Sequence, residues 1–289
     1  MDKTLLARID PPHPHWVGDG FHVRSLFSYQ ARTSENSPFL MLDHGEPEFF
    51  GPTRQPRGVG AHPHRGIETV TLAYSGEVAH RDSTGGGGVI GPGDVQWMTA
   101  GAGLLHEEFH SPAFSAAGGT MHMAQLWVNL PARDKMTPPS YQAIVAADIP
   151  QVDLPEGGHM RVIGGRYGEV AGPARTRSPL LVADARLPAG AAWRWAVPEG
   201  WNALLVVLQG ELRLSAAGEG PTLKTSQHVV CSREGDGLSM QATQDSLLLL
   251  LAGEPLDEPV VGYGPFVMNS RDEIMQAMRD FNDGKFGRM

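Results

Sequence analysis

The sequence predicts an all-β protein made of two tandem β-barrels. The chain of 289 residues contains 36 Gly and 23 Pro, and this composition favours short strands joined by tight turns over long helices. Runs of β-branched, aromatic and aliphatic residues recur between these turn residues. Two stretches of the chain also resemble each other at a constant offset, which is the signature of a duplicated unit.

Five apolar runs bounded by Gly, Pro, Asn or Asp are predicted to be strands: residues 68–77, 95–98, 121–130, 203–214 and 247–252. The Gly-rich tract 82–93 is predicted to be a loop that ends in a tight Gly-Pro-Gly turn. No helix is predicted to follow this tract, so it lacks an element that a phosphate-binding loop requires.

One helix is predicted near the C-terminus. Ser270 and Glu273 have the spacing of a capping box, and Gly284 marks the end of the helix. Between them, apolar residues recur at helical spacing: Ile274, Met275, Met278 and Phe281. We expect this apolar face to pack on a barrel.

The internal repeat defines the expected domains. An offset of 134 residues superimposes Gly76-Glu77 on Gly210-Glu211, and without a gap it also carries Gly101 and Gly103 onto Gly235 and Gly237. Residues 131–179 are rich in Pro, Gly and charge, as suits a connection. We therefore expect an N-terminal metal-binding barrel over residues 1–135 and a degenerate barrel with the terminal helix over residues 136–289.

Charge and targeting signals narrow the class of protein. The net charge of −9 and the lack of a basic cluster argue against direct binding of nucleic acid. Cys231 is the single cysteine and cannot close an intrachain disulfide. Residues 1–15 lack the apolar core of a signal peptide, and the aliphatic run 247–251 is too short to span a membrane. We expect a cytoplasmic protein without membrane association.

Two pairs of potential metal ligands stand out. His62 and His64 are separated by one residue, so on a strand both point to the same face with backbones about 6.6 Å apart. His106 and Glu108 repeat this spacing after a strand, a glycine loop and a return strand. Three imidazoles and one carboxylate leave open positions on a divalent ion that prefers six ligands, whereas a structural zinc site more often recruits thiolates. The sequence predicts one mononuclear metal site.

Other acidic residues fit this site less well. Glu68 lies four residues beyond His64, about 13 Å along a regular strand, and Glu107 should face away from Glu108. The segment His13-Pro14-His15 has the same sequence as His62-Pro63-His64, but no second pair of potential ligands on a predicted strand accompanies it. Glu108 is therefore the expected carboxylate ligand.

Several residues are candidates for the pocket without a decisive signal. His110 shares the face of His106, and a surface position is favoured for it over a place at the pocket mouth. Gln125 and Trp127 should face one side of a later strand and His122 the other, as pocket lining or core.

The second barrel is not expected to bind metal. The 134-residue offset carries the four proposed ligands onto residues that are unsuited to such a site, namely Ala196, Pro198, Met240 and Ala242. The duplication thus predicts one site in the chain and not two.

The stretch HPHRGIETVTLAYSGEVAHRDSTGGGGVIGPGDVQWMTAGAGLLHEE closely resembles the N-terminal signature of the pirins, two-barrel members of the cupin superfamily. MHMAQLWVNLP and GPFVMNSRDEI resemble further pirin segments. The resemblance implies two jelly-roll-like cupin barrels, with cupin motifs over residues 60–76 and 101–106. The chain departs from the usual cupin pattern at Gly101 and His110. In pirins the carboxylate comes from the second motif, which matches Glu108.

The resemblance also implies a chemistry. Pirins usually hold iron, while such sites also accept nickel, copper, manganese, cobalt or zinc. Bacterial pirins resemble flavonol dioxygenases, so the expected activity is oxidative cleavage of a flavonol such as quercetin with dioxygen. As a separate hypothesis, Glu108 or an outer carboxylate accepts the proton of the flavonol hydroxyl group. One alternative is a redox-sensing pirin that regulates a protein partner without turnover. Another is an enzyme that acts on a different enolisable or catechol-like compound. Since two barrels in one chain reproduce the pairing of single-barrel cupins, we expect a monomer.

Overall fold

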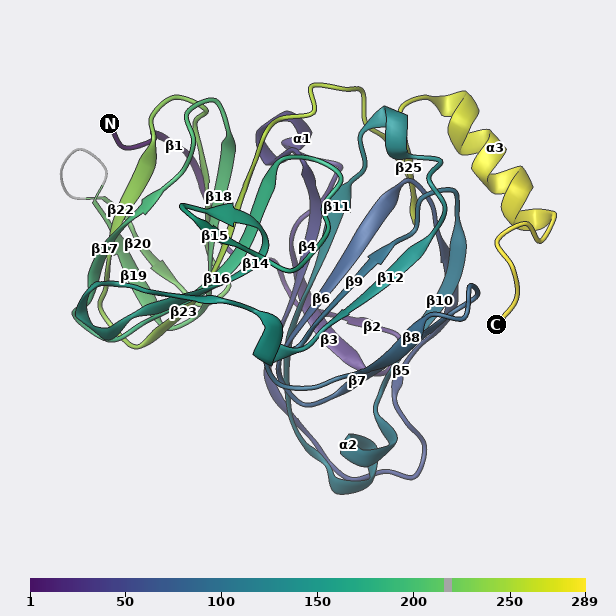
Figure 1. Ribbon diagram of the computed structural model, residues 1–289. Coiled ribbons are helices and arrows are strands. Elements are labelled where there is room, and N and C mark those ends of the chain that lie inside the picture. The colour runs from purple at the N-terminus through teal and green to yellow at the C-terminus, as the bar shows by residue number, and fades with distance from the viewer. Residues whose placement is uncertain (216–219) are drawn as a thin grey trace. The chain divides into compact units, whose positions relative to one another are not determined.

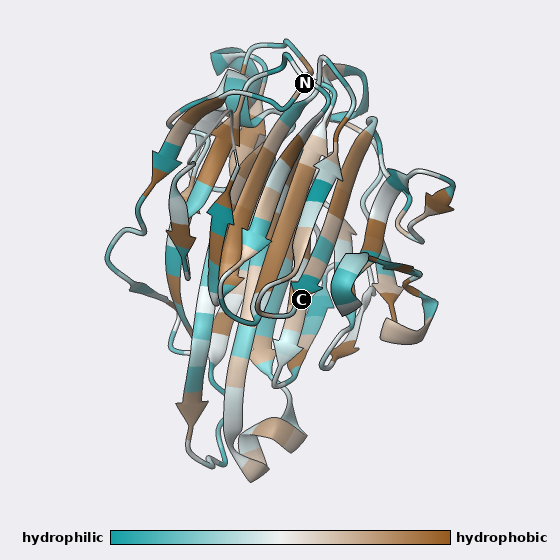
Figure 2. Cartoon of the chain, turned by 90° about the vertical axis from the view of Figure 1, so that its left-hand side faces the viewer, coloured by the Kyte–Doolittle hydropathy of each residue, from teal (hydrophilic) through white to brown (hydrophobic). Residues whose placement is uncertain are grey.

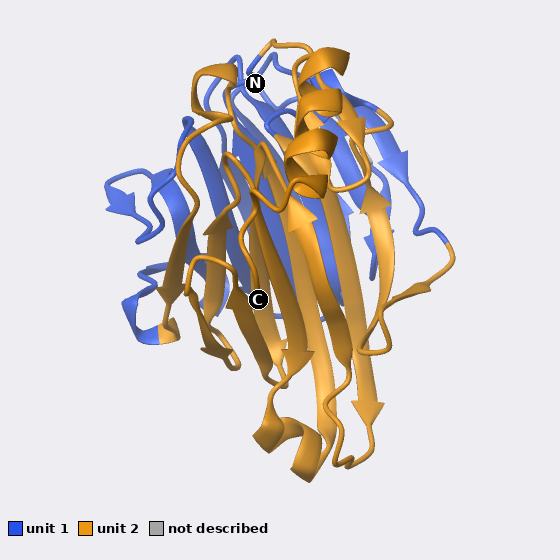
Figure 3. Cartoon of the chain, turned by 90° about the vertical axis from the view of Figure 1, so that its right-hand side faces the viewer, with its two compact units in different colours: residues 1–12, 32–38, 147–256 blue, residues 13–31, 39–146, 257–289 orange. Residues whose placement is uncertain are grey.

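The computed structural model describes residues 1–215 and 220–289. The chain forms two compact units, shown in Figures 1 and 3. Unit 1 comprises residues 1–12, 32–38 and 147–256, and unit 2 comprises residues 13–31, 39–146 and 257–289. Each unit contains a long and a short antiparallel sheet, so the predicted pair of barrels is confirmed.

Unit 2 holds the two predicted pairs of ligands. Its long sheet has this strand order: β12 (Ser140–Ile144), β9 (Val95–Thr99), β6 (Ile67–Ser75), β11 (Gly119–Asn129), β4 (Phe39–Phe50), β3 (Phe21–Phe27) and β2 (His15–Val17). Its short sheet has the order β5 (Gly58–His64), β10 (Leu104–His110), β7 (Val78–Asp82) and β8 (Gly87–Ile90). A separate hairpin joins β24 (Val261–Tyr263) and β25 (Phe266–Met268).

Unit 1 repeats this plan. Its long sheet has the order β1 (Leu5–Ile9), β21 (His228–Cys231), β18 (Asn202–Gln209), β23 (Ser246–Gly253), β16 (Leu180–Leu187), β14 (His159–Tyr167) and β13 (Gln151–Asp153), with β15 (Val170–Ala171) beside β14. Its short sheet has the order β17 (Ala192–Ala196), β22 (Gly237–Ala242), β19 (Glu211–Leu214) and β20 (Thr222–Lys224). The chain therefore connects and pairs the strands from β16 to β23 in the same order as the strands from β4 to β11.

Most predicted strands are present, and two expectations needed correction. The run 203–214 is broken at Gly210, which has a φ of +92° and turns the chain from β18 into β19; Gly76 does the same after β6 with a φ of +79°. The tract 82–93 is not all loop, because Gly87–Ile90 forms β8 and pairs with β7. The sequence did not predict this strand because it begins with two glycines, and Gly is unfavourable in a strand interior.

The helices are short except for the predicted one. They are α1 (Thr33–Asn36), α2 (Pro112–Ala117) and α3 (Arg271–Asn282), with 3₁₀ turns at Ala132–Asp134, Ala146–Asp148 and Pro155–Gly157. The Ser270 side chain caps α3 by accepting from the Glu273 amide, and Ser270 Oγ donates to the Glu273 carboxylate. The predicted cap is therefore confirmed.

The predicted apolar face of α3 is only partly correct. Ile274 and Ala277 are buried, whereas Met275, Met278 and Phe281 are 48%, 38% and 38% exposed. Within the described residues, no helix is both long enough and apolar enough to cross a lipid bilayer. Figure 2 shows that long apolar runs lie instead along the strands.

The units exchange terminal segments, which the boundary expected at 135/136 does not describe. Strand β1 pairs with β21 and completes the long sheet of unit 1, as β12 pairs with β9 in unit 2. The terminal helix α3 belongs to unit 2, where it contacts β24 and β25, and not to the second barrel as expected.

A buried lysine precedes each of these edge strands. Lys3 Nζ donates to the carbonyls of Trp201, Ser232 and Arg233. Lys135 Nζ donates to the carbonyls of Gly66 and Val267 and to Asn129 Oδ1. Each ammonium thus has an acceptor for each of its protons, which offsets the cost of burying it.

Candidate metal centre

Strands β5 and β10 bring the predicted histidines together. In their antiparallel register His62 lies opposite His106, and His64 lies opposite Leu104. Ring nitrogens of His62, His64 and His106 lie within 4.8 Å of one another, so one ion could contact all three. His64 and His106 are buried, and His62 is half-buried.

Glu108 faces the barrel interior, as strand alternation predicts. Along β10 the residues Leu104, His106, Glu108 and His110 are buried and the residues between them are less so. Glu108 is 2% exposed. Its Oε1 accepts hydrogen bonds from Thr71 Oγ1 at 3.1 Å and Gln96 Nε2 at 3.3 Å, and its Oε2 accepts from Gln125 Nε2 at 3.2 Å.

These donors belong to a continuous row of polar residues across the long sheet, which we call the polar row. Cross-strand pairing places its members side by side on five neighbouring strands, in the order Ser25, Asp43, Gln125, Thr71 and Gln96. Directly paired residues point to the same face of a sheet. The polar row therefore spans the inner face of the barrel at the level of Glu108.

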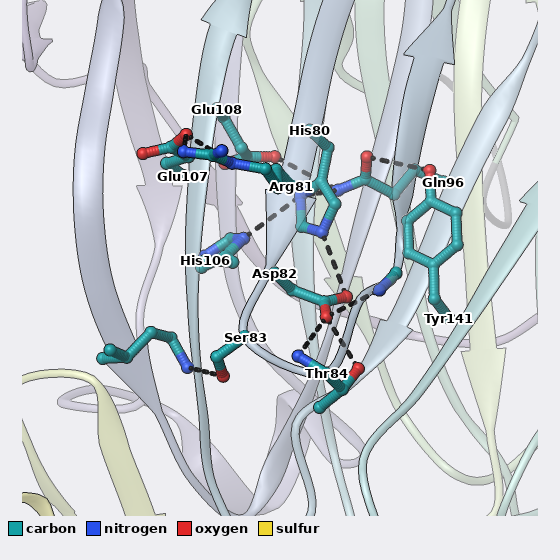
Figure 4. Close-up of polar contacts among 12 residues, drawn as sticks. His80, Arg81, Asp82, Ser83, Thr84, Gln96, His106, Glu107, Glu108 and Tyr141 are labelled. Atoms are coloured by element: carbon teal, nitrogen blue, oxygen red, sulfur yellow. Dashed lines mark hydrogen bonds and ion pairs between the residues drawn. The ribbon is translucent and has the colours of Figure 1, made fainter. Parts of the chain in front are cut away.

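His80 is a site residue that the sequence reasoning missed. It lies on β7, which pairs with β10, and it forms a second group with His106 and Glu108 whose ligand atoms also lie within 4.8 Å. Figure 4 shows its ring between His106, Gln96 and Asp82. His80 Nδ1 lies 3.0 Å from Gln96 Nε2 and 3.3 Å from His106 Nδ1, and His80 Nε2 lies 3.6 Å from Asp82. The sequence signal that could have found it is the two-residue spacing of His80 and Asp82, which on a strand points both side chains to the same face.

Burial favours the neutral form of His64, His106 and His80. It lowers the pKa of His64 to about 3, with the nearby His62 ring adding to the effect. Burial also holds the pKa of His106 well below its usual range, helped by the other rings. Burial lowers the pKa of His80 as well, although Glu108 and Asp82 oppose the shift. Neutral imidazole is the form that binds a metal ion.

The donor set fits a divalent ion. His62 Nδ1 lies 2.9 Å from the Gly60 carbonyl, an arrangement that leaves Nε2 for a ligand. His106 Nε2 is buried without a hydrogen-bond partner in the described part of the chain. The Glu108 carboxylate is buried among neutral donors, and a buried carboxylate normally requires a cation or a metal. The two groups of potential ligands share His106, with His62 and His64 in one group and His80 and Glu108 in the other. An ion held at His106 would give both its Nε2 and the Glu108 carboxylate a partner.

A pocket of about 230 Å³ opens beside these residues. His62, His64 and Glu108 line it together with Asp43 and Gln125. The remaining walls are mostly apolar: Val17, Phe21, Val23, Met41, Val59, Met123, Trp127 and Pro265. Since one water occupies about 30 Å³ in the liquid, the pocket has room for a ligand larger than water.

The other candidate residues lie outside the centre. Glu68 is buried and accepts a hydrogen bond from Thr99 Oγ1, and Glu107 faces away and pairs with Arg81. His110 is neither at the surface nor at the pocket mouth, because it is 1% exposed and its Nε2 donates to the Gly20 carbonyl. His122 faces away from the pocket and lies 3.2 Å from His44. Neither potential metal group found among the described residues includes a histidine of the 13–15 segment.

In unit 1, the residues equivalent to the polar row are apolar. The 134-residue offset carries Thr71 onto Leu205, and pairing through the equivalent strands gives a row of fully buried residues, Val162, Ala183, Leu250, Leu205 and Val229. We call this the apolar row. The offset does not hold along β17, since Ala196 and Pro198 are exposed and Trp193 and Trp195 point inward. The two groups of potential metal ligands that occur among the described residues both lie in unit 2.

Comparison with known proteins identifies the family. The sequence model described as Pirin matches residues 20–128, and the one described as Pirin C-terminal cupin domain matches residues 182–287. The chain belongs to the pirin family. The two-cupin architecture expected from the resemblance is thereby confirmed.

Named pirin relatives cover nearly the whole chain. A Pseudomonas aeruginosa protein named provisionally as a quercetin 2,3-dioxygenase is 56% identical over 285 residues, 98% of each chain. A pirin-like protein of Solanum lycopersicum is 39% identical and covers 99% of this chain and 92% of its own length. The crystal structure of quercetin 2,3-dioxygenase from Acinetobacter baumannii matches with a TM-score of 0.96 at 53% identity, over 99% of each chain.

Proposed function

We propose that this pirin is a metal-dependent dioxygenase that cleaves a flavonol such as quercetin. The observation that carries the proposal is the meeting of histidine side chains and a buried carboxylate at one mostly apolar pocket. Two relatives that match nearly the entire chain bear the name quercetin 2,3-dioxygenase, one of them provisionally.

His62, His64, His106 and Glu108 are the proposed ligands of one divalent ion. We expect iron, with nickel, copper, manganese, cobalt or zinc as alternatives, because nitrogen and oxygen ligands accept all of them. We assign His80 outside this set. Its Nδ1 faces Gln96 and His106 while its Nε2 faces Asp82, so it orients His106 rather than reaching the pocket.

A divalent ion bound there supplies Lewis acidity, which lowers the pKa of a coordinated substrate hydroxyl and prepares the substrate for dioxygen. Residues of the chain provide the remaining functions. Thr71, Gln96 and Gln125 hold the Glu108 carboxylate in one orientation. Glu108 is the proposed acceptor of the hydroxyl proton. The apolar walls exclude bulk water from the reacting groups.

Turnover of quercetin tests the proposal directly. The purified protein is loaded with iron(II) and supplied with quercetin under air, and the loss of flavonol absorbance and the release of carbon monoxide are followed. We expect His62→Ala to abolish both. His13→Ala is the matched control because His13 stands in the same His-Pro-His spelling outside the centre. Lack of turnover with every common divalent metal would overturn the proposal.

A second candidate is a regulatory pirin that senses the redox state of its metal and binds a protein partner. The observation in its favour is the exposure of Met275, Met278 and Phe281 along α3, because exposed apolar residues can mark an interaction surface. Metal binding without turnover of quercetin would favour this function. The monomeric state stays a prediction, which gel filtration checks.

A further inference from the structure

Asp43 is a buried carboxylic acid in the pocket that metal binding leaves unexplained. It is 9% exposed and lines the pocket with His62, His64 and Glu108. It belongs to neither group of potential metal ligands in the described chain. Its role must therefore differ from that of Glu108.

The polar row divides into two parts. Gln125, Thr71 and Gln96 are explained by Glu108, to which all three donate. Asp43 lies next in the row after Gln125, one strand further from β6, a step of about 4.8 Å. Only Ser25 follows, and its hydroxyl donates to Asp43 Oδ1 at 2.5 Å. The second carboxyl oxygen is left for a ligand.

The fold itself does not require a carboxyl group at this level. In unit 1 the corresponding position of the apolar row is Ala183, between Val162 and Leu250. Among the residues that the structure describes, no Lys or Arg forms an ion pair with Asp43. Burial raises the pKa of its carboxyl, and the Ser25 hydrogen bond and the nearby His15 offset only part of this effect. Asp43 thus occupies a position where desolvation makes it costly.

We propose that Asp43 determines substrate specificity by accepting a hydrogen bond from a ligand hydroxyl group that the metal does not hold. This inference rests on the proposed function and adds a requirement to it: the aromatic substrate carries a second hydroxyl group, placed toward β4. The polar contact sits among apolar walls such as Val23, Met41 and Trp127, so the fit is to a polyphenol and not to an unsubstituted aromatic ring.

The expected effect is large because the acceptor can be charged and the pocket is desolvated. A hydrogen bond to a charged group changes affinity by about 10- to 100-fold. A ligand that lacks the hydroxyl group would leave the carboxylate without its partner and would bind correspondingly more weakly.

The test compares two flavonols that share the metal-binding 3-hydroxyl and 4-carbonyl groups: quercetin and 3-hydroxyflavone, which has no other hydroxyl group. Dissociation constants are measured by tryptophan fluorescence on protein loaded with zinc(II), which is redox-inert. Asp43→Ala removes the acceptor, and Asp43→Leu, which is similar in shape and also has no acceptor, serves if the alanine variant does not fold. Glu46→Ala is the control, since Glu46 lies on the same strand, pairs with Arg24 and is absent from the pocket lining.

We expect Asp43→Ala to raise the dissociation constant of quercetin by about 10- to 100-fold and to leave that of 3-hydroxyflavone unchanged. Glu46→Ala should leave both dissociation constants unchanged. Equal effects of Asp43→Ala on the two flavonols would overturn this inference, while quercetin turnover by the wild-type protein would keep the proposed function. Failure of the wild-type protein to bind either flavonol would overturn both.

Discussion

Gln125→Leu isolates the support that the polar row gives to Glu108. Gln125 Nε2 donates to Glu108 Oε2, whereas Thr71 and Gln96 both donate to Oε1. Among the described residues, the substitution therefore removes the side-chain donor of one carboxylate oxygen and keeps those of the other. Leucine is the residue that unit 1 has at the equivalent place, Leu250, so the fold accommodates it.

The magnitude follows from the charge of the acceptor. A hydrogen bond to a charged group contributes about 1.5–3 kcal/mol, which corresponds to metal binding weakened about 10- to 100-fold, the range found for outer partners of metal ligands. At a metal concentration 100 times the dissociation constant, metal stabilises the wild-type protein by about 2.7 kcal/mol. A 100-fold weaker site would keep about 0.4 kcal/mol.

Two measurements report this loss. Competition with a chelator gives the metal affinity, and urea unfolding with and without metal gives the stabilisation. Gln142→Leu is the control, because Gln142 is buried on the same sheet but its neighbour Ala143, not Gln142, pairs with Gln96, which places Gln142 on the opposite face. Unchanged metal affinity in Gln125→Leu, or an equal loss in Gln142→Leu, would refute the reasoning.

Three further predictions concern the role of His80, the stability of the protein in acid and the buried Lys135. His62→Ala should abolish metal binding measured by elemental analysis, whereas His80→Ala should keep the metal with reduced affinity; the reverse result would favour the group of His80, His106 and Glu108. Unfolding free energy should fall below pH 6.5 by about 1.4 kcal/mol per pH unit for each histidine that stays neutral when folded. Burial lowers the pKa of two such residues away from the metal, His44 to about 3 and His228 to about 4. Their unfolded forms take up protons first, so stability is complete above pH 6.5 and is lost toward pH 4; a flat urea midpoint between pH 7 and 5 would contradict this. Lys135→Met should lower the melting temperature, because it strips donors from buried acceptors at a cost of about 1–3 kcal/mol each, and the exposed Lys224→Met should not.

Local periodicity accounts for what the sequence predicted correctly. The i, i+2 spacing of His62 with His64 and of His106 with Glu108 fixes the face of each pair on its strand. Ser270 and Glu273 likewise specify the start of α3 within one turn. These features depend only on neighbours along the chain, so the sequence contains them fully.

The features that were missed depend on which strands become neighbours. His80 reaches His106 because β7 pairs with β10, and Asp43 joins the polar row because β4 pairs with β11. A constant offset did not locate the inward residues of β17. Trp193 pairs with Met240 as His62 pairs with His106, which is an offset of 131 and not 134, and an odd shift moves every side chain to the other face. Ala196, predicted at the position of His62, is exposed for this reason.

The exchange of edge strands has a consequence for how the chain can be made and divided. During synthesis Leu5–Ile9 emerges long before its partner β21, so the sheet of unit 1 is complete only after the chain that separates the two strands has been made. A fragment that begins after residue 12 would leave the edge of β21 open, and an open strand edge invites pairing between molecules. Supplying residues 1–12 as a separate peptide should therefore restore solubility to such a truncated protein.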